Sequence, residues 1–176
     1  MSNGSTFLVL IPEEVKDISN SLRYASFRAR ETGGRVALLS IVEPEEIGAW
    51  GGVDKVMTDD AFDRARKVME YYVASVQELS GTEPLTLFRK GQRRATLLEV
   101  IESEPDISAF VLTAYSDEAR CNTFIQYLTS EKGLKKLPIP LIVVPDNCCR
   151  YDVVEKEPSE EETKNSEKEE KDVHTD

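Results

Sequence analysis

The hydrophobic residues of the chain form short continuous runs separated by longer stretches with helical spacing. Five apolar runs, at residues 7–11, 36–42, 85–88, 107–113 and 141–144, predict β-strands, the third being the weakest. Runs without polar alternation are typical of parallel strands that helices cover on both faces. We therefore expect a parallel sheet buried between two layers of helices.

The stretch between the first two runs predicts a helix, because its apolar residues recur at helical spacing. The stripe begins at Ile18 and continues through Leu22, Ala25 and Ala29. A glycine pair at residues 33–34 is expected to end this helix, since glycine readily adopts the left-handed conformation found after a helix end.

A second, longer helix is expected to begin near residue 59. Asp59 and Asp60 then stand in its first turn, where the helix dipole favours negative charge, and Gly81 ends it. Before it, residues 45–58 are expected to form a glycine-containing loop. That loop carries Trp50, which either packs against the domain or caps a crevice or partner surface. The buried face of the helix is expected to comprise Phe62, Ala65, Met69, Tyr72, Val73, Val76 and Leu79.

Two further helices complete the pattern. Leu97, Leu98 and Ile101 mark a short third helix that ends before Pro105, and a fourth lies within residues 117–136. Strands that alternate with helices predict one α/β domain with a five-stranded, parallel, doubly wound, Rossmann-like sheet. Ligands of such sheets bind at the carboxyl ends of the strands, where the winding direction reverses.

The acidic residues are concentrated at the C-terminal end of the chain. Residues 152–176 contain 11 acidic residues and 4 lysines, a net charge of −7 out of −11 for the whole chain. Val173 is the only aliphatic residue after position 154, so this segment has too little apolar surface to offset the entropy of ordering it. We expect a domain at residues 1–150 and a disordered acidic tail at residues 151–176; docking of a basic partner on the tail is the alternative.

Composition excludes several classes of function. An acidic chain argues against nucleic-acid binding, which depends on Lys and Arg. No apolar run approaches the roughly 20 residues that span a bilayer. The first residues lack the basic segment and cleavage site of a secretion signal. We expect a cytoplasmic protein that binds neither nucleic acid nor membrane.

The cysteines and the histidine point away from catalysis. Cys121, Cys148 and Cys149 are an odd number and include an adjacent pair, which is not a disulfide framework. The pair is either redox active or a chance occurrence; chance is favoured, because adjacent cysteines form a strained disulfide and only Arg150 is near to activate a thiolate. His174, the only histidine, falls in the tail. We expect no catalytic residue, no metal site and no enzymatic activity.

Residues 6–146 resemble the universal stress protein (UspA-like) family. The resemblance is carried by FLVLIP at residues 7–12, TGGRVALLSIVEP at 32–44 and SEKGLKKLPIPLIVVP at 130–145. The segments at residues 45–61 and 126–140 are similar to a subgroup found in alphaproteobacteria. The resemblance implies an adenine nucleotide alpha hydrolase-like fold, a role in the stress response, and a homodimer.

The family's ATP site is altered in this sequence. ATP-binding members carry, after strand four, glycine, two residues, glycine, nine residues, glycine and then serine or threonine. These positions fall here on Ala114, Asp117, Tyr127 and Leu128. Glycines let backbone N–H groups approach phosphate oxygens, and the hydroxyl donates to them. Because none of these groups is present, we expect that conventional ATP binding has been lost and that the protein has no cofactor.

The ends of the predicted strands carry both acidic and polar residues. The acidic residues that we expect to gather at one crevice and repel an anion are Glu13, Glu14, Asp117 and Glu118. If the crevice still binds a ligand, we expect contacts from Pro12, Val42, Thr113, Ser116 and Ser130. A shifted phosphate site would use Ser116, Thr129 or Ser130. Arg93 and Arg94 precede the third helix and are expected on the surface, because cations at a helix start oppose its dipole.

The fifth strand suggests how the chain associates. The resemblance implies that it lies at the edge of the sheet, where an unpaired apolar strand is an aggregation hazard. We expect a homodimer through Leu141, Ile142, Val143 and Val144. The leading hypothesis for function is a non-enzymatic stress-response module that is dimeric, has lost ATP and contacts an unidentified protein partner. The alternatives are a sensor that binds adenine nucleotide or another small ligand in the crevice by other contacts, and a weak nucleotide hydrolase.

Overall fold

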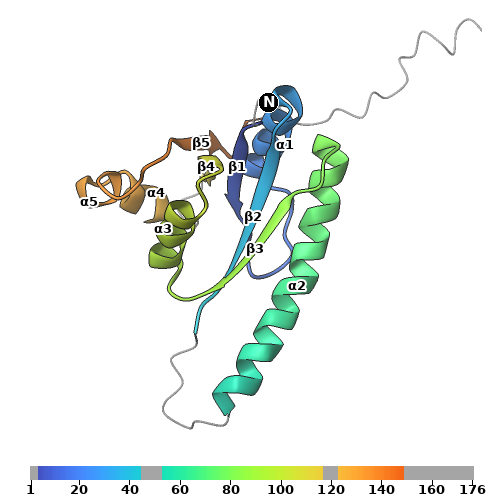
Figure 1. Cartoon of the computed structure of the whole chain (residues 1–176), viewed down its shortest axis with the longest axis vertical. Helices are drawn as coiled ribbons and strands as arrows, with labels where there is room; N and C mark the ends of the chain where they lie inside the picture. The colour runs from blue at the N-terminus through green and yellow to red at the C-terminus, as the bar shows by residue number, and fades with distance from the viewer. Residues whose placement is uncertain (1–3, 45–52, 117–122, 149–176) are drawn as a thin grey trace, which may run out of the picture.

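A single parallel sheet organises the molecule. The computed structural model describes residues 4–44, 53–116 and 123–148; the acidic tail, Trp50 and Asp117 lie outside these ranges. The sheet order is β3-β2-β1-β4-β5, and every neighbouring pair is parallel (Figure 1). The predicted doubly wound sheet is confirmed, and β5 lies at an edge. The strands are β1 (Thr6–Leu10), β2 (Arg35–Val42), β3 (Leu85–Lys90), β4 (Ile107–Ala114) and β5 (Leu141–Pro145).

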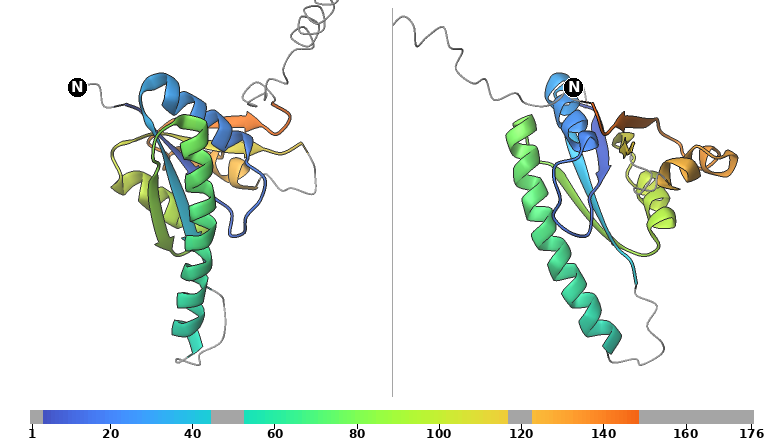
Figure 2. Two further views of the ribbon diagram at one scale, coloured as in Figure 1. Left: turned by 90° about the vertical axis from the view of Figure 1, so that its right-hand side faces the viewer. Right: turned by 180° about the vertical axis from the view of Figure 1, so that it is seen from behind.

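Helices cover both faces of this sheet. Helices α1 (Asn20–Thr32) and α2 (Val53–Ser80) lie on one face, and α3 (Arg93–Ser103), α4 (Thr123–Leu128) and α5 (Glu131–Leu134) lie on the other (Figure 2). Each face has its own hydrophobic core, so each strand contributes alternate residues to both. Phe110 and Leu128 are completely buried on the α3 side. No helix in the described ranges is long and apolar enough to cross a membrane.

Both ends of α1 are formed by local sequence signals. The Ser19 hydroxyl accepts a hydrogen bond from the backbone N–H of Leu22, which caps the start of the helix. Gly33 follows the end of the helix with φ of 64°, and its N–H bonds to the carbonyl of Ala29. A Cβ on Gly34 would stand 2.0 Å from the Ser5 carbonyl oxygen. The predicted glycine stop is therefore confirmed, and its second glycine permits the close passage of β1.

Helix α2 begins earlier than predicted. It starts at Val53 rather than near Asp59, so the loop predicted for residues 45–58 is wrong for residues 53–58. Asp59 and Asp60 consequently lie in the second turn and not in the first. The glycines that indicated a loop all precede Val53, and a helix that has formed gains one hydrogen bond for each residue added.

The fourth predicted helix is two short helices. Helix α4 ends at Leu128, and Ser130 caps the start of α5 by accepting from the N–H of Gly133. A Cβ on Gly133 would lie 2.2 Å from the Tyr127 carbonyl oxygen, so the close approach of α5 to α4 requires glycine there. The break in the helix thus places Leu128 in the core and turns the chain toward β5.

The hydroxyl of Tyr72 joins α2 to the connection between β1 and α1. It accepts from the Lys16 N–H and donates to the Lys16 carbonyl, both at 3.1 Å. Burial raises the pKa of Tyr72 above its ordinary value of 10.0. Only the protonated hydroxyl can make both bonds. The connection that leads away from the carboxyl end of β1 is therefore held in place by one side chain.

We expect Tyr72→Phe to lower the free energy of unfolding by about 1 kcal/mol at neutral pH, the usual value of a hydrogen bond. Because the folded-state pKa is raised, the contribution of Tyr72 is complete below pH 10.0 and is lost as pH rises through the folded-state value. The alkaline loss of stability measured by urea unfolding should therefore be smaller in the variant. Tyr71→Phe, at an exposed neighbouring position, is the matched control; an equal effect there would contradict this assignment.

Candidate ligand cleft at the strand ends

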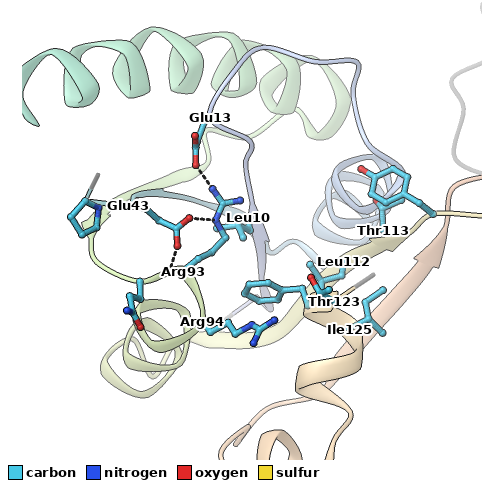
Figure 3. Close-up of a pocket in the computed structure, with 13 residues that line it drawn as sticks. Leu10, Glu13, Glu43, Arg93, Arg94, Leu112, Thr113, Thr123 and Ile125 are labelled. Carbon is cyan, nitrogen blue, oxygen red and sulfur yellow. Dashed lines mark hydrogen bonds and ion pairs between the residues drawn. The ribbon is translucent and has the colours of Figure 1, made fainter. Parts of the chain in front are cut away.

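A cleft opens where the winding of the sheet reverses. It has a volume of about 930 Å³ and lies at the carboxyl ends of β1 and β4, the position expected for a ligand in a doubly wound sheet (Figure 3). Its apolar lining consists of Leu10, Pro44, Leu112, Phe124 and Ile125. Its polar lining consists of Glu13, Glu43, Gln92, Arg93, Arg94, Thr113, Tyr115 and Thr123.

Arg93 connects the ends of β1 and β2 through two carboxylates. Its guanidinium donates a hydrogen bond to Glu13, and its Nε lies 3.7 Å from an oxygen of Glu43 (Figure 3). That second separation suits an ion pair but exceeds a hydrogen bond, and the buried Nε has no hydrogen-bond partner among the described residues. The Arg93 side chain is 30% exposed. Arg93 is therefore partly buried and paired, whereas Arg94 is exposed as predicted.

Glu43 also caps helix α3. The backbone N–H of Arg93 donates to a Glu43 carboxylate oxygen at 2.9 Å, whereas the side chain of Gln92, the residue at the cap position, makes no such bond. A carboxylate at a helix start is favourable because it interacts with the positive end of the helix dipole. Glu43 therefore offsets the cost of placing two arginines in the first turn of α3.

Within the part of the chain that the structure describes, the carboxylates of this cleft are balanced by guanidinium groups. Glu13 lines it as expected, but its charge is engaged by Arg93. Glu14 is exposed and is not among the lining residues, and Asp117 and Glu118 lie outside the described residues. The described lining contains two carboxylates and two guanidinium groups, Arg94 being the second. The prediction that four acidic residues gather there is therefore wrong for Glu14, and for Glu13 the position is as expected but the charge is paired.

The positions that align with the ATP motif are occupied by packed side chains. Tyr127 is partly buried, and the Arg94 guanidinium lies over its ring at 4.9 Å from the centroid. Leu128 is completely buried in the core on the α3 side. Both residues stand at the end of α4, not at the start of a helix. The Ala114 carbonyl accepts from the N–H of Asp146, so the backbone here connects β4 to the end of β5.

The structure brings together two of the five residues predicted to contact a ligand. Thr113 lines the cleft, and Pro12 lines an adjoining hollow that shares Leu10 and Arg93 with it. The other three have structural partners elsewhere. The Val42 carbonyl accepts from Gly91, Ser116 donates to the Asp146 carboxylate through N–H and hydroxyl, and Ser130 donates to the Tyr127 carbonyl while capping α5.

The hydroxyl of Thr113 already has partners within the protein. It accepts from the Ser21 N–H at 2.9 Å and donates to the Ser21 hydroxyl at 3.0 Å. Ser21 in turn lies 2.9 Å from the Ser19 hydroxyl, which caps α1. This chain of hydroxyls connects the start of α1 to the end of β4. Because the Thr113 hydroxyl donates its proton to Ser21, that proton is not available to a ligand.

Several lining residues were not predicted from sequence. Glu43 follows the second strand directly, so the rule that ligand sites lie at strand carboxyl ends would have identified it. Phe124 and Ile125 gave no such signal, because they belong to a short helix whose position depends on the break at residues 129–130. Among the described residues, no group of three or more His, Cys, Asp or Glu side chains is placed to hold a metal ion.

No protein-family model and no curated protein sequence matches the chain. Solved structures do match it. Universal stress protein UspA from Lactobacillus plantarum superposes with a TM-score of 0.61 at 17% identity, covering 82% of this chain and 99% of that one. The universal stress protein of Archaeoglobus fulgidus in complex with dAMP gives 0.53 at 18%, covering 79% and 96%. An Arabidopsis thaliana universal stress protein family protein with AMP bound gives 0.54 at 13%, covering 82% and 93%. The fold implied by the resemblance is confirmed.

We expect Arg93→Met to lower the free energy of unfolding by about 1 kcal/mol, because the change leaves Glu13 and Glu43 facing each other without a cation. The loss should shrink at high salt, where repulsion between the carboxylates is screened. Arg66→Met is the matched control: Arg66 pairs with Asp63 on the exposed surface of α2, and its loss should cost only about 0.3 kcal/mol. Equal losses in urea unfolding would show that the Arg93 contacts are no more than surface pairs.

Proposed function

We propose that this chain is a non-enzymatic universal stress protein that acts in the stress response as a dimeric interaction module in the cytoplasm. We also propose that it has lost conventional ATP binding. The observation that carries the proposal is what occupies the positions that align with the phosphate motif of the family. Its last two positions are filled by the Tyr127 ring beneath Arg94 and by Leu128 in the core.

The helix starts near the cleft support the loss of ATP. A triphosphate is normally held by free backbone N–H groups at a helix start or in a glycine-rich turn. Here the N–H of Arg93 at the start of α3 is already bonded to Glu43. Helix α4 has six residues and carries Tyr127 and Leu128 where the family has glycine and a hydroxyl. Two of the structural neighbours contain AMP or dAMP, so an adenine nucleotide is the ligand against which the loss of binding has to be tested.

The composition of the cleft supports a non-enzymatic role. Its described lining contains no histidine or cysteine, the residues most often used as general base or nucleophile. The lining carboxylates, Glu13 and Glu43, are both engaged by Arg93. A hydrolase would need a carboxylate free to orient water beside a held phosphate.

We expect isothermal titration calorimetry to detect no binding of ATP with magnesium to the purified full-length chain. We also expect no nucleotide in the extract of the denatured protein, because neither the glycines nor the hydroxyl of the phosphate site is present. A nucleotide-binding universal stress protein, measured in parallel, is the positive control. Micromolar affinity for ATP would contradict the proposal and show that other groups hold the phosphates.

The exposed edge of β5 supports the proposed dimer. The carbonyl of Pro140 and the N–H of Asp146 both bond to β4. Because backbone groups alternate in direction along a strand, the N–H and carbonyl of Val143 point away from β4, toward the open edge. The Val143 side chain is also 41% exposed. Twofold pairing of β5 with the same strand of a second copy, through residues 141–144, would satisfy these groups and cover Val143, whereas Val144 is already buried.

We expect size-exclusion chromatography with light scattering to give the mass of a dimer for the unmodified chain and of a monomer for Val143→Pro. Proline removes the N–H that faces the open edge and leaves the bonds to β4 intact. Val143→Thr keeps both the N–H and the branched shape, so this variant should remain dimeric. A monomeric unmodified chain at micromolar concentration would rule out the dimer.

The open cleft favours a second candidate, a sensor of a small ligand. Its volume falls within the range of known ligand pockets, about 300–1,000 Å³. Its mixture of apolar walls and a few polar groups is also typical of such sites. Under this candidate, ligand binding beside α3 and α4 modulates the contacts of the module with its protein partner.

A further inference from the structure

The two arginines of the cleft differ in their charge partners. Arg93 is surrounded by two carboxylates, those of Glu13 and Glu43. Arg94 has no carboxylate partner among the described residues, and its recorded contact is with the face of the Tyr127 ring. A guanidinium that lies over an aromatic ring still has N–H groups that can donate to a ligand.

The contact with the Tyr127 ring also helps to position Arg94 in the cleft. Figure 3 shows its guanidinium reaching from α3 toward Thr123 and Ile125 on α4. Tyr127 is itself packed against the core on the α3 side, so the core supports the ring over which the guanidinium lies. The planar guanidinium of arginine can form two parallel hydrogen bonds with the two oxygens of a carboxylate.

The charges of the described lining limit the ligand to few negative charges. Arg93 and the two glutamates contribute a net charge of −1, and Arg94 brings the total to zero. One negative charge near Arg94 therefore has a partner, whereas a polyphosphate would bring several charges against Glu13 and Glu43. Inorganic anions also fit poorly, because they would leave the apolar part of the lining uncovered.

Four apolar residues of the wall come from two strands and one helix. Leu10 and Leu112 come from the neighbouring strands β1 and β4, and Phe124 and Ile125 come from α4. All four side chains are only partly buried, so a ligand that covers them removes apolar surface from water. An aromatic or branched hydrocarbon group suits this surface.

We propose that the cleft binds a small monocarboxylate with an apolar body. Its carboxylate pairs with the guanidinium of Arg94, and its body packs on Leu10, Leu112, Phe124 and Ile125. The site differs from the aligned phosphate positions, because it uses the start of α3 and the apolar face of α4. It gives the second candidate function, the sensor, a ligand class and rests on that candidate, but it does not depend on whether the chain dimerises.

The test is a titration of the isotope-labelled full-length chain, followed by amide NMR signals. The probes are phenylacetate, its neutral analogue phenylacetamide, acetate and AMP. Phenylacetate should shift the signals of Leu112, Phe124 and Ile125. Phenylacetamide and acetate should each bind at least about tenfold more weakly, since each lacks one of the two recognised groups.

Variants of Arg94 identify the group that recognises the charge. Arg94→Gln should weaken phenylacetate binding at least about tenfold, and Arg94→Lys should give an intermediate loss because it keeps the charge without the planar fork. Arg66→Gln, on the exposed surface of α2, should leave the affinity unchanged. If Arg94→Gln fails to fold, Arg94→Lys and the probe series on the unmodified chain still decide the question.

Three results would overturn the proposal. Equal binding of phenylacetate and phenylacetamide would show that charge is not recognised, and equal binding of phenylacetate and acetate would show that the apolar wall is not used. Tighter binding of AMP with no effect of Arg94→Gln would assign the cleft to nucleotides, leaving the sensor candidate in place. Absence of binding by all four probes would remove both the ligand class and the sensor, while the dimeric module would stand on its own test.

Discussion

Because the five strands are parallel, each connection must leave the sheet at its carboxyl edge, cross one face and re-enter at the amino edge. Right-handed crossovers then place α1 and α2 on one face and the later helices on the other. The connections that follow β1 and β4 must separate at the carboxyl edge, because they lead to opposite faces. This separation opens the cleft, so the position of the candidate site follows from the direction of the strands.

Interactions between side chains then decide what the cleft presents to a ligand. Glu43 follows β2, Glu13 follows β1, and Arg93 begins α3; the guanidinium draws these three segments together. The same Glu43 carboxylate completes the hydrogen bonding of α3 by accepting from its first N–H. One carboxylate therefore serves both as helix cap and as counter-ion. Arg94, the next residue, has no carboxylate partner in the described part of the chain.

Two residues that align with the phosphate motif of the family that the sequence resembles, Tyr127 and Leu128, take part in the protein's own packing. A short α4 ends with Leu128 in the core, and a glycine at position 133 lets α5 approach within van der Waals distance. Tyr127 turns to α3 and supports Arg94. Leu128 is thus buried at the point where the helix ends, so an altered position of the motif coincides with a break between two helices.

The order and type of nearly all elements followed from sequence, because continuous apolar runs and helical stripes report burial directly. The glycine stop of α1 and the edge position of β5 also agreed with expectation. The start of α2 did not, because the glycines before Val53 indicated a loop that was expected to continue to residue 58. For the site, sequence identified Glu13, Thr113 and the altered phosphate positions, which follow strands or a known spacing. Only the tertiary structure decided that Arg93 neutralises Glu13, that Arg94 lies on Tyr127 and that α4 supplies an apolar wall. The physical reason is that charge pairing and ring stacking depend on distances between segments far apart in the chain, which local patterns do not encode.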